Sequence, residues 1–225
     1  MDLLNLSVAQ EYGGVLLQGL GMTVMLTVVV ILLALVLAIP VALLRMSPSL
    51  AVRTAIGIYV EVIRATPLLL QLVYIYYVLP SIGINLNPIV AAIVGLTLNY
   101  TAYMSEVYRS GIMAVPKNQW EAAATLGMTR ARAFWRIILP QAVRIVTPTL
   151  GNYFISLFKD TALASVVTVQ ELTFTGQIIS ARSYQYFTIY TLTAILYFAV
   201  GYPSALLVRQ IEKRARSGYR RRRVR

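Results

Sequence analysis

Residues 121–140 have the sequence EAAATLGMTRARAFWRIILP, a short basic stretch between two long apolar parts of the chain. Written on a helix, Phe134 and Ile138 fall on one face, while Arg132 and Arg136 fall on the opposite face. Small residues and a glycine come before this amphipathic part. The pattern predicts a surface segment that lies along a membrane and connects helices that cross it.

The composition supports a membrane protein. Of 225 residues, 58% are hydrophobic and 12% are charged, and the mean hydropathy is +0.71. Residues 12–44 and 65–105 contain no charged residue at all. A helix needs about 20 apolar residues to cross about 30 Å of hydrocarbon. The chain is therefore predicted to be an all-α polytopic membrane protein.

The net charge of +12 is concentrated in a few places. Residues 1–44 and 65–108 contain no Lys or Arg, whereas residues 209–225 hold nine of the twenty basic residues. Basic clusters beside apolar runs mark the cytoplasmic side of a membrane, and anionic lipid accounts for a basic tail. We expect an external N-terminus, a cytoplasmic C-terminus and no nucleic-acid partner.

The residue types that are missing limit the chemistry. The chain has no cysteine and no histidine, which removes thiolate metal sites and the commonest general base. None of its three lysines belongs to a Gly-x-x-x-x-Gly-Lys-Ser/Thr phosphate loop. We expect no catalytic residues, no metal site and no cofactor. Any ATP that drives this protein would be bound by another chain.

Hydropathy and breaker residues predict five crossings. The expected helices cover residues 16–44, 54–79, 88–108, a fourth from about 141, and 187–208. Pro148 and Gly151 are expected to interrupt the fourth helix. Residues 161–187 are more polar and are predicted to form a partly re-entrant segment.

The basic stretch itself is expected to fold as a bent elbow. Pro116 can begin a short helix that ends at Gly127, a residue suited to the left-handed conformation that closes helices. Thr129 can cap a second short helix. Two short amphipathic helices joined at a glycine would then lie at the membrane surface.

The spacing of this stretch resembles the signature loop of the membrane subunits of ATP-driven importers. Glu-Ala-Ala is followed four residues later by glycine, and Ile-x-Leu-Pro ends at Pro140. The resemblance covers about residues 15–215 and implies the five-transmembrane-helix core of a type I ABC importer permease. It implies a single domain over 1–225, a cytoplasmic coupling loop at about 116–140 and a basic cytoplasmic tail at 209–225. It assigns contact with an ATPase to Glu121, Ala122, Ala123, Gly127 and Pro140.

Three further blocks, at residues 61–71, 99–106 and 151–154, resemble polar amino-acid permeases of the histidine, glutamine and arginine type. The resemblance implies that substrate contacts come from Thr66, Pro67, Asn99, Thr101 and Tyr153. A proline within a helix frees a backbone carbonyl that a ligand can use. An acidic residue in place of Tyr153 would suit a cationic amino acid, so tyrosine argues against that choice.

Several polar residues within the apolar runs have structural explanations as well. Glu61 and Arg64 can pair on one helix face, and Lys159 can pair with Asp160. Asn99 can bind substrate or donate a hydrogen bond to another helix. A structural role is favoured for both charged pairs, and for Asn99 the two interpretations remain open.

The resemblance implies the transmembrane subunit of an importer in the bacterial plasma (inner) membrane, which forms the pathway for a polar amino acid or similar zwitterion. It implies two cytoplasmic ATP-binding subunits, a second permease subunit of the same or a homologous chain, and an extracytoplasmic substrate-binding protein. The alternative is an ion-coupled secondary transporter or channel, in which Glu61, Glu106 and Asp160 would bind ions or protons.

Overall fold

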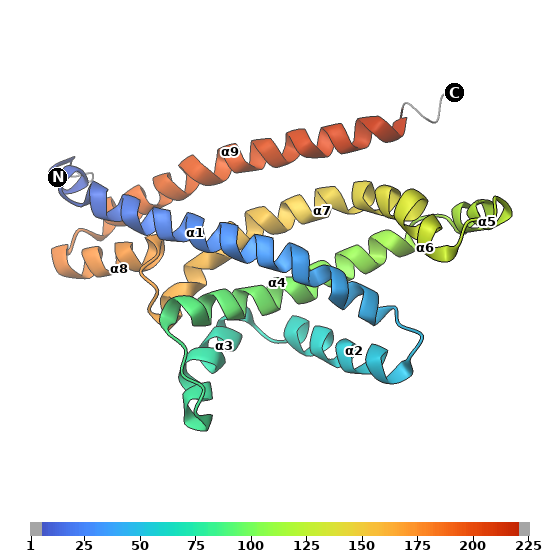
Figure 1. Ribbon diagram of the computed structural model, residues 1–225. Helices are drawn as coiled ribbons and strands as arrows, with labels where there is room; N and C mark the ends of the chain where they lie inside the picture. Colours follow the sequence, from blue (N-terminus) through green and yellow to red (C-terminus); the bar gives the residue numbers. More distant parts are fainter. Residues whose placement is uncertain (1–5, 221–225) are drawn as a thin grey trace.

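A computed structural model describes residues 6–220, and every regular element in that range is helical (Figure 1). The α-helices are α1 (Leu6–Arg45), α2 (Leu50–Ala65), α3 (Leu68–Val73), α4 (Pro88–Met113), α5 (Lys117–Thr125), α6 (Arg130–Ala133), α7 (Leu139–Asp160), α8 (Leu172–Ser183) and α9 (Tyr186–Arg220). Short π-helical turns cover Tyr74–Val78 and Phe134–Ile138, and 3₁₀ turns cover Leu79–Ile82 and Thr161–Val167. Residues 221–225 of the predicted basic tail lie outside the described residues.

The helices account for the predicted crossings. Three of them, α1, α4 and α9, are long and apolar enough to cross a membrane. Two bent pairs, α2 with α3 and α6–α7 with α8, bring the number to as many as five. The all-α, five-crossing architecture predicted from the sequence is thus confirmed, with α1 beginning ten residues earlier than expected.

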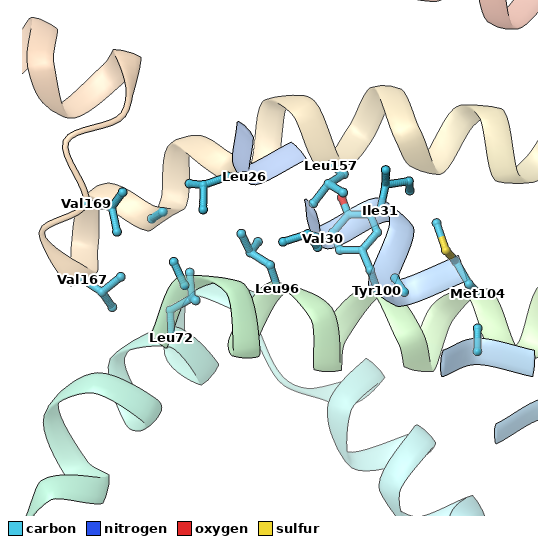
Figure 2. Close-up of a cluster of buried hydrophobic side chains, with 14 residues drawn as sticks. Leu26, Val30, Ile31, Leu72, Leu96, Tyr100, Met104, Leu157, Val167 and Val169 are labelled. Carbon is cyan, nitrogen blue, oxygen red and sulfur yellow. The ribbon is translucent and has the colours of Figure 1, made fainter. Parts of the chain in front are cut away.

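Helix α4 lies at the centre of the molecule. In the apolar stretch of α4, 61% is buried inside the molecule, compared with 6% in the apolar stretch of α9. Leu26 and Val30 from α1 pack against Leu96 and Tyr100 from α4, with Leu157 from α7 closing the cluster (Figure 2). Burial of large apolar side chains within the bundle fixes how α1, α4 and α7 lie relative to one another.

The contact between α4 and α7 requires a glycine. A Cβ atom at Gly111 would overlap the side chain of Val146 on α7. The absence of a side chain lets the two helices approach closely near the elbow, where Ile112, Ile138 and Ala142 form a second buried cluster. The elbow is packed against α4 through this cluster.

The second predicted helix is broken. The expected continuous helix over 54–79 instead ends at Ala65, and α3 begins at Leu68 after a bend of 108°. Thr66 and Pro67 have extended backbone conformations, as expected for a residue that precedes proline. The apolar composition on both sides hid this bend from hydropathy.

The predicted interruption of the fourth helix is wrong. Helix α7 runs unbroken through Pro148 and Gly151. Packing against α4 and α9 outweighs the loss of one backbone hydrogen bond at the proline. The actual break follows Asp160, where a 3₁₀ turn leads to α8, and α8 is bent by 52° from the preceding span.

Candidate functional site

A cavity of about 480 Å³ opens at the break between α2 and α3. It has the volume of a small-molecule site. Three elements supply its wall: the α2–α3 break, α4 and α7. The lining residues are Arg64, Ala65, Thr66, Pro67, Leu68, Asn99, Tyr100, Tyr103, Tyr153, Ser156 and Asp160.

Four of the five residues expected to contact substrate come together here. Thr66, Pro67, Asn99 and Tyr153 line the cavity. Thr101 does not line it, because it lies on α4 two residues beyond Asn99 and is buried at 3% exposure. Its hydroxyl oxygen has no hydrogen-bond partner among the described residues.

Gln71, which the sequence analysis gave no role, holds the break in place. Its Nε2 donates to the carbonyl of Ile63 at 2.7 Å and to the hydroxyl of Thr66 at 2.8 Å. Ile63 is the residue whose carbonyl Pro67 leaves without its helical partner, so Gln71 rather than a ligand satisfies it. The prediction of a free carbonyl at this point is therefore wrong.

The same amide joins α3 to α4. Asn99 Nδ2 donates to Gln71 Oε1 at 3.0 Å. Asn99 therefore makes the interhelical hydrogen bond that was one of its two interpretations, while it also borders the cavity. The side chain that satisfies the Ile63 carbonyl lies one turn after the proline in the sequence, so only a search for polar residues at that position could have found it.

The cavity contains one cation and one carboxylate. Arg64 lies in the last turn of α2, and its guanidinium carbon lies 5.5 Å from the centre of the Tyr103 ring. Asp160 ends α7 and accepts a hydrogen bond of 2.7 Å from the hydroxyl of Tyr100. The ring centroid of Tyr153 lies 6.0 Å from that of Tyr103 and 6.1 Å from that of Tyr100. Three tyrosine rings thus line the same cavity as the two opposite charges.

The ion pairs expected from sequence neighbours do not form. Glu61 bonds Arg45 at 3.2 Å rather than Arg64, and Asp160 bonds Tyr100 rather than Lys159. Arg45 also contacts Glu106, which in turn holds Arg109 at 2.7 Å. Because the acids of α2 and α4 are neutralised by arginine, they join the ends of α1, α2 and α4 as structural groups.

The elbow has the predicted geometry. Helix α5 is followed by Gly127 in the left-handed conformation, with φ +70°. The hydroxyl of Thr129 then accepts a hydrogen bond from the backbone of Arg132 at 3.4 Å and caps α6. The elbow lies at the opposite end of the molecule from α8 (Figure 1).

The expected coupling residues divide between two surfaces. Glu121, Ala122 and Gly127 are exposed, whereas Ala123 is buried at 1% exposure. Pro140 is exposed in the first turn of α7. Leu126 is 77% exposed at the tip of the elbow, although it is a large apolar residue that the sequence analysis did not single out.

The elbow is connected to the cavity through α7. Gln141 in its first turn donates to the side chain of Gln119 on α5 at 3.3 Å. The same helix ends at Asp160 in the cavity wall. Its 22 residues span about 33 Å at about 1.5 Å per residue. One continuous helix thus connects the two places where functional residues were expected.

Residues 31–217 match the model of the family described as binding-protein-dependent transport system inner membrane component. The chain belongs to this family. It is a permease subunit of an ABC importer, and the family assignment favours this function over an ion-coupled carrier or channel. Members of the family work with an ATPase, a substrate-binding protein and generally a second permease.

Curated relatives extend over nearly the whole chain. The L-cystine transport system permease protein TcyB of Bacillus subtilis (strain 168) is 41% identical over 92% of this chain and 89% of its own length. The probable glutamine ABC transporter permease protein GlnP of the same organism is 36% identical, with 92% and 96% covered.

Solved structures share the fold. A crystal structure of an amino acid ABC transporter with histidines superimposes with a TM-score of 0.89 at 36% identity, over 94% of this chain and 99% of that one. The inward-facing MetNI methionine ABC transporter gives a TM-score of 0.71 at 20% identity, over 89% and 98% of the chains, which shows the fold alone.

Proposed function

We propose that this chain forms the membrane pathway for a polar amino acid and binds it in the cavity at the α2–α3 break. The observation that supports this proposal most strongly is that Arg64 and Asp160 line the same cavity. An α-amino acid carries a carboxylate and an ammonium group. Arg64 matches the first and Asp160 the second, since charge-assisted hydrogen bonds are about twice as strong as neutral ones.

The other lining groups suit the same class of substrate. Thr66 and Asn99 add a hydroxyl and an amide at the break, and Pro67 shapes the wall between them. Tyr153 presents an aromatic surface with a hydroxyl to the substrate side chain. No acidic group other than Asp160 lines the cavity among the described residues, so a neutral polar amino acid fits better than a dibasic one. The relatives named for cystine and glutamine transport agree with this class.

The elbow is the proposed contact with the ATPase, because its exposed tip carries a large apolar side chain. Leu126 at 77% exposure, with Glu121, Ala122 and Gly127 beside it, offers a small surface that a groove could receive. Ala123 and Pro140 would support it from behind, at the packed side of α5 and the start of α7. Movement of α5 would be transmitted through the contact between Gln119 and Gln141 to α7 and its Asp160.

The assembly would comprise two permease subunits, the same or homologous, two cytoplasmic ATP-binding subunits and an external binding protein. ATP hydrolysis would occur in the ATP-binding subunits. The domain is taken as 1–225, with the coupling loop at 116–140 and the tail after 209 on the cytoplasmic side. Basic residues flank these segments, which agrees with the positive-inside rule.

The test replaces Asp160 with asparagine, which keeps the shape and an acceptor for the Tyr100 hydroxyl while removing the charge. Losing a charged hydrogen bond is worth about 10- to 100-fold in substrate affinity. Binding of labelled neutral amino acids to the purified complex is compared with binding of their N-acetyl derivatives, which carry no ammonium group. We expect Asp160→Asn to abolish this discrimination.

Lys159→Gln is the matched control, because it removes a neighbouring charge that does not line the cavity. The control should keep the parent's discrimination. Unchanged preference for the free amino acid in Asp160→Asn, with the complex still assembled, would show that the substrate ammonium binds elsewhere.

A further inference from the structure

A second cavity, of about 260 Å³, lies between α1, α4, α7 and the π-helical turn that follows α6. Its wall is built from apolar side chains, including Ile39 and Leu43 of α1, Ile112 of α4 and Val143 of α7. Tyr108 brings a hydroxyl to the lining, and that hydroxyl already donates to the carbonyl of Leu35 at 3.3 Å. The wall therefore offers nothing to a polar solute or to water, which needs two to four polar partners.

The mouth of the cavity faces outward from the bundle. Ile39, Leu43 and Val143 are 49%, 42% and 48% exposed, and Trp135 at the mouth is 64% exposed. In a chain that crosses a membrane, large apolar side chains with this exposure meet lipid tails. The lining thus continues the lipid-facing surface inward as a hollow.

The cavity lies where the apolar spans end. Arg45 closes α1 two residues after Leu43, and Arg109 follows Tyr108 directly on α4. Tryptophan is enriched at this depth, where an amphipathic ring meets the headgroups. The hollow therefore lies at the depth of the part of the acyl chains nearest the headgroups, close to the lipid phosphates.

Two cations flank Trp135 in the sequence, on the segment that borders the hollow. Arg132 and Arg136 are one turn apart on the segment that carries Trp135, and both are exposed. Neither guanidinium has a hydrogen-bond or ion-pair partner among the described residues. Arginine in this position is suited to a phosphate oxygen, to which it can donate in a planar, two-pronged arrangement.

We infer that this hollow binds one anionic phospholipid, with an acyl chain between α1 and α7 and its headgroup phosphate held by Arg132 and Arg136. The apolar wall selects the chain and the two unpaired arginines select negative charge. Such a lipid would touch both the elbow and the first helix, and it would hold the elbow at a fixed angle to the bundle. The site is separate from the substrate cavity and shares no lining residue with it.

Tryptophan fluorescence provides the test, because the chain has two tryptophans. In the full chain carrying Trp120→Phe, Trp135 at the mouth is the sole emitter. The protein is placed in lipid nanodiscs of phosphatidylcholine that contain a small fraction of phospholipid brominated near the headgroup end of its chains. Brominated phosphatidylglycerol and brominated phosphatidylcholine are compared at equal mole fraction.

We expect phosphatidylglycerol to quench Trp135 at a mole fraction roughly 25-fold lower than phosphatidylcholine, since each of the two arginines near the membrane surface contributes about fivefold. Arg132→Gln and Arg136→Gln should each reduce this preference by about fivefold, and the double variant should remove it. Arg209→Gln, which removes an exposed arginine on α9, is the control and should leave it unchanged. Equal quenching by the two lipids, or a preference that survives the double variant, would overturn the site.

Discussion

At the scale of single residues, the substrate cavity depends on how one helix break is repaired. Pro67 leaves the carbonyl of Ile63 without a helical donor, and Gln71 supplies one from its side chain. Through its own oxygen, Gln71 then receives a hydrogen bond from Asn99 on α4. One amide therefore fixes both the bend and the distance between two walls of the cavity.

Replacing Gln71 with leucine should loosen this part of the molecule. Asn99 is buried, and a buried polar group that loses its partner costs about 1–3 kcal/mol. The half-buried carbonyl of Ile63 and hydroxyl of Thr66 lose the same donor. We expect a lower apparent Tm of the purified chain and weaker substrate binding by the complex. Gln177→Leu, at an exposed position on α8, is the matched control for added hydrophobicity. A variant as stable as this control and with the parent's affinity would contradict the role given to Gln71.

The polar residues show which contacts a sequence can predict and which it cannot. The blocks around Thr66, Asn99 and Tyr153 were identified correctly as neighbours in space. The pairing of Glu61 was not, because its partner Arg45 lies 16 residues away on a different helix, α1. Asp160 likewise accepts its hydrogen bond from Tyr100, which lies 60 residues away in the sequence. Local spacing predicts pairs along one helix, whereas these partners are set by helix packing.

At the scale of elements, the elbow is a short helix, a left-handed glycine and a capped second helix. Gly127→Val should disturb this turn, since a β-branched residue is costly at a positive φ. Gly127→Asn is the control, because asparagine tolerates this conformation. We expect valine, more than asparagine, to lower uptake per ATP hydrolysed in the reconstituted complex. The same ratio in both variants and the parent would separate the elbow from coupling.

The elements also differ in how well hydropathy predicts them. The uncharged runs predict α1, α4 and α9 because each crosses the bundle as one apolar helix. They fail at α2 and α3, since leucine-rich sequence continues past the bend at Pro67, after which α3 packs on α4 and on the 3₁₀ turn that follows α7. At Pro148 the error is the reverse: the sequence predicts a break, but the packed helix α7 continues through the proline. Breaker residues show where a helix can bend, and packing decides whether it does.

At the scale of the whole molecule, the two ends of the bundle differ in chemistry. The elbow and the end of α9 lie toward one end, while α8 and the start of α1 lie toward the other (Figure 1). The apolar stretch of helix α9 is only 6% buried, which leaves a long apolar face for lipid or for a second permease. Helix α7 joins the elbow to the cavity between these ends.

This polarity predicts the orientation in the membrane. The elbow should face the cytoplasm and the turn between α8 and α9 the outside, because the basic clusters flank the elbow and the chain end. Since the chain has no cysteine, single cysteines can be introduced at Leu126 and Tyr184, which are 77% and 80% exposed. In intact cells, a membrane-impermeant maleimide should label position 184 but not position 126. Permeabilised cells are the control, in which both positions should react. Labelling of position 126 from outside would reverse the orientation, and with it the assignment of the elbow to a cytoplasmic ATPase.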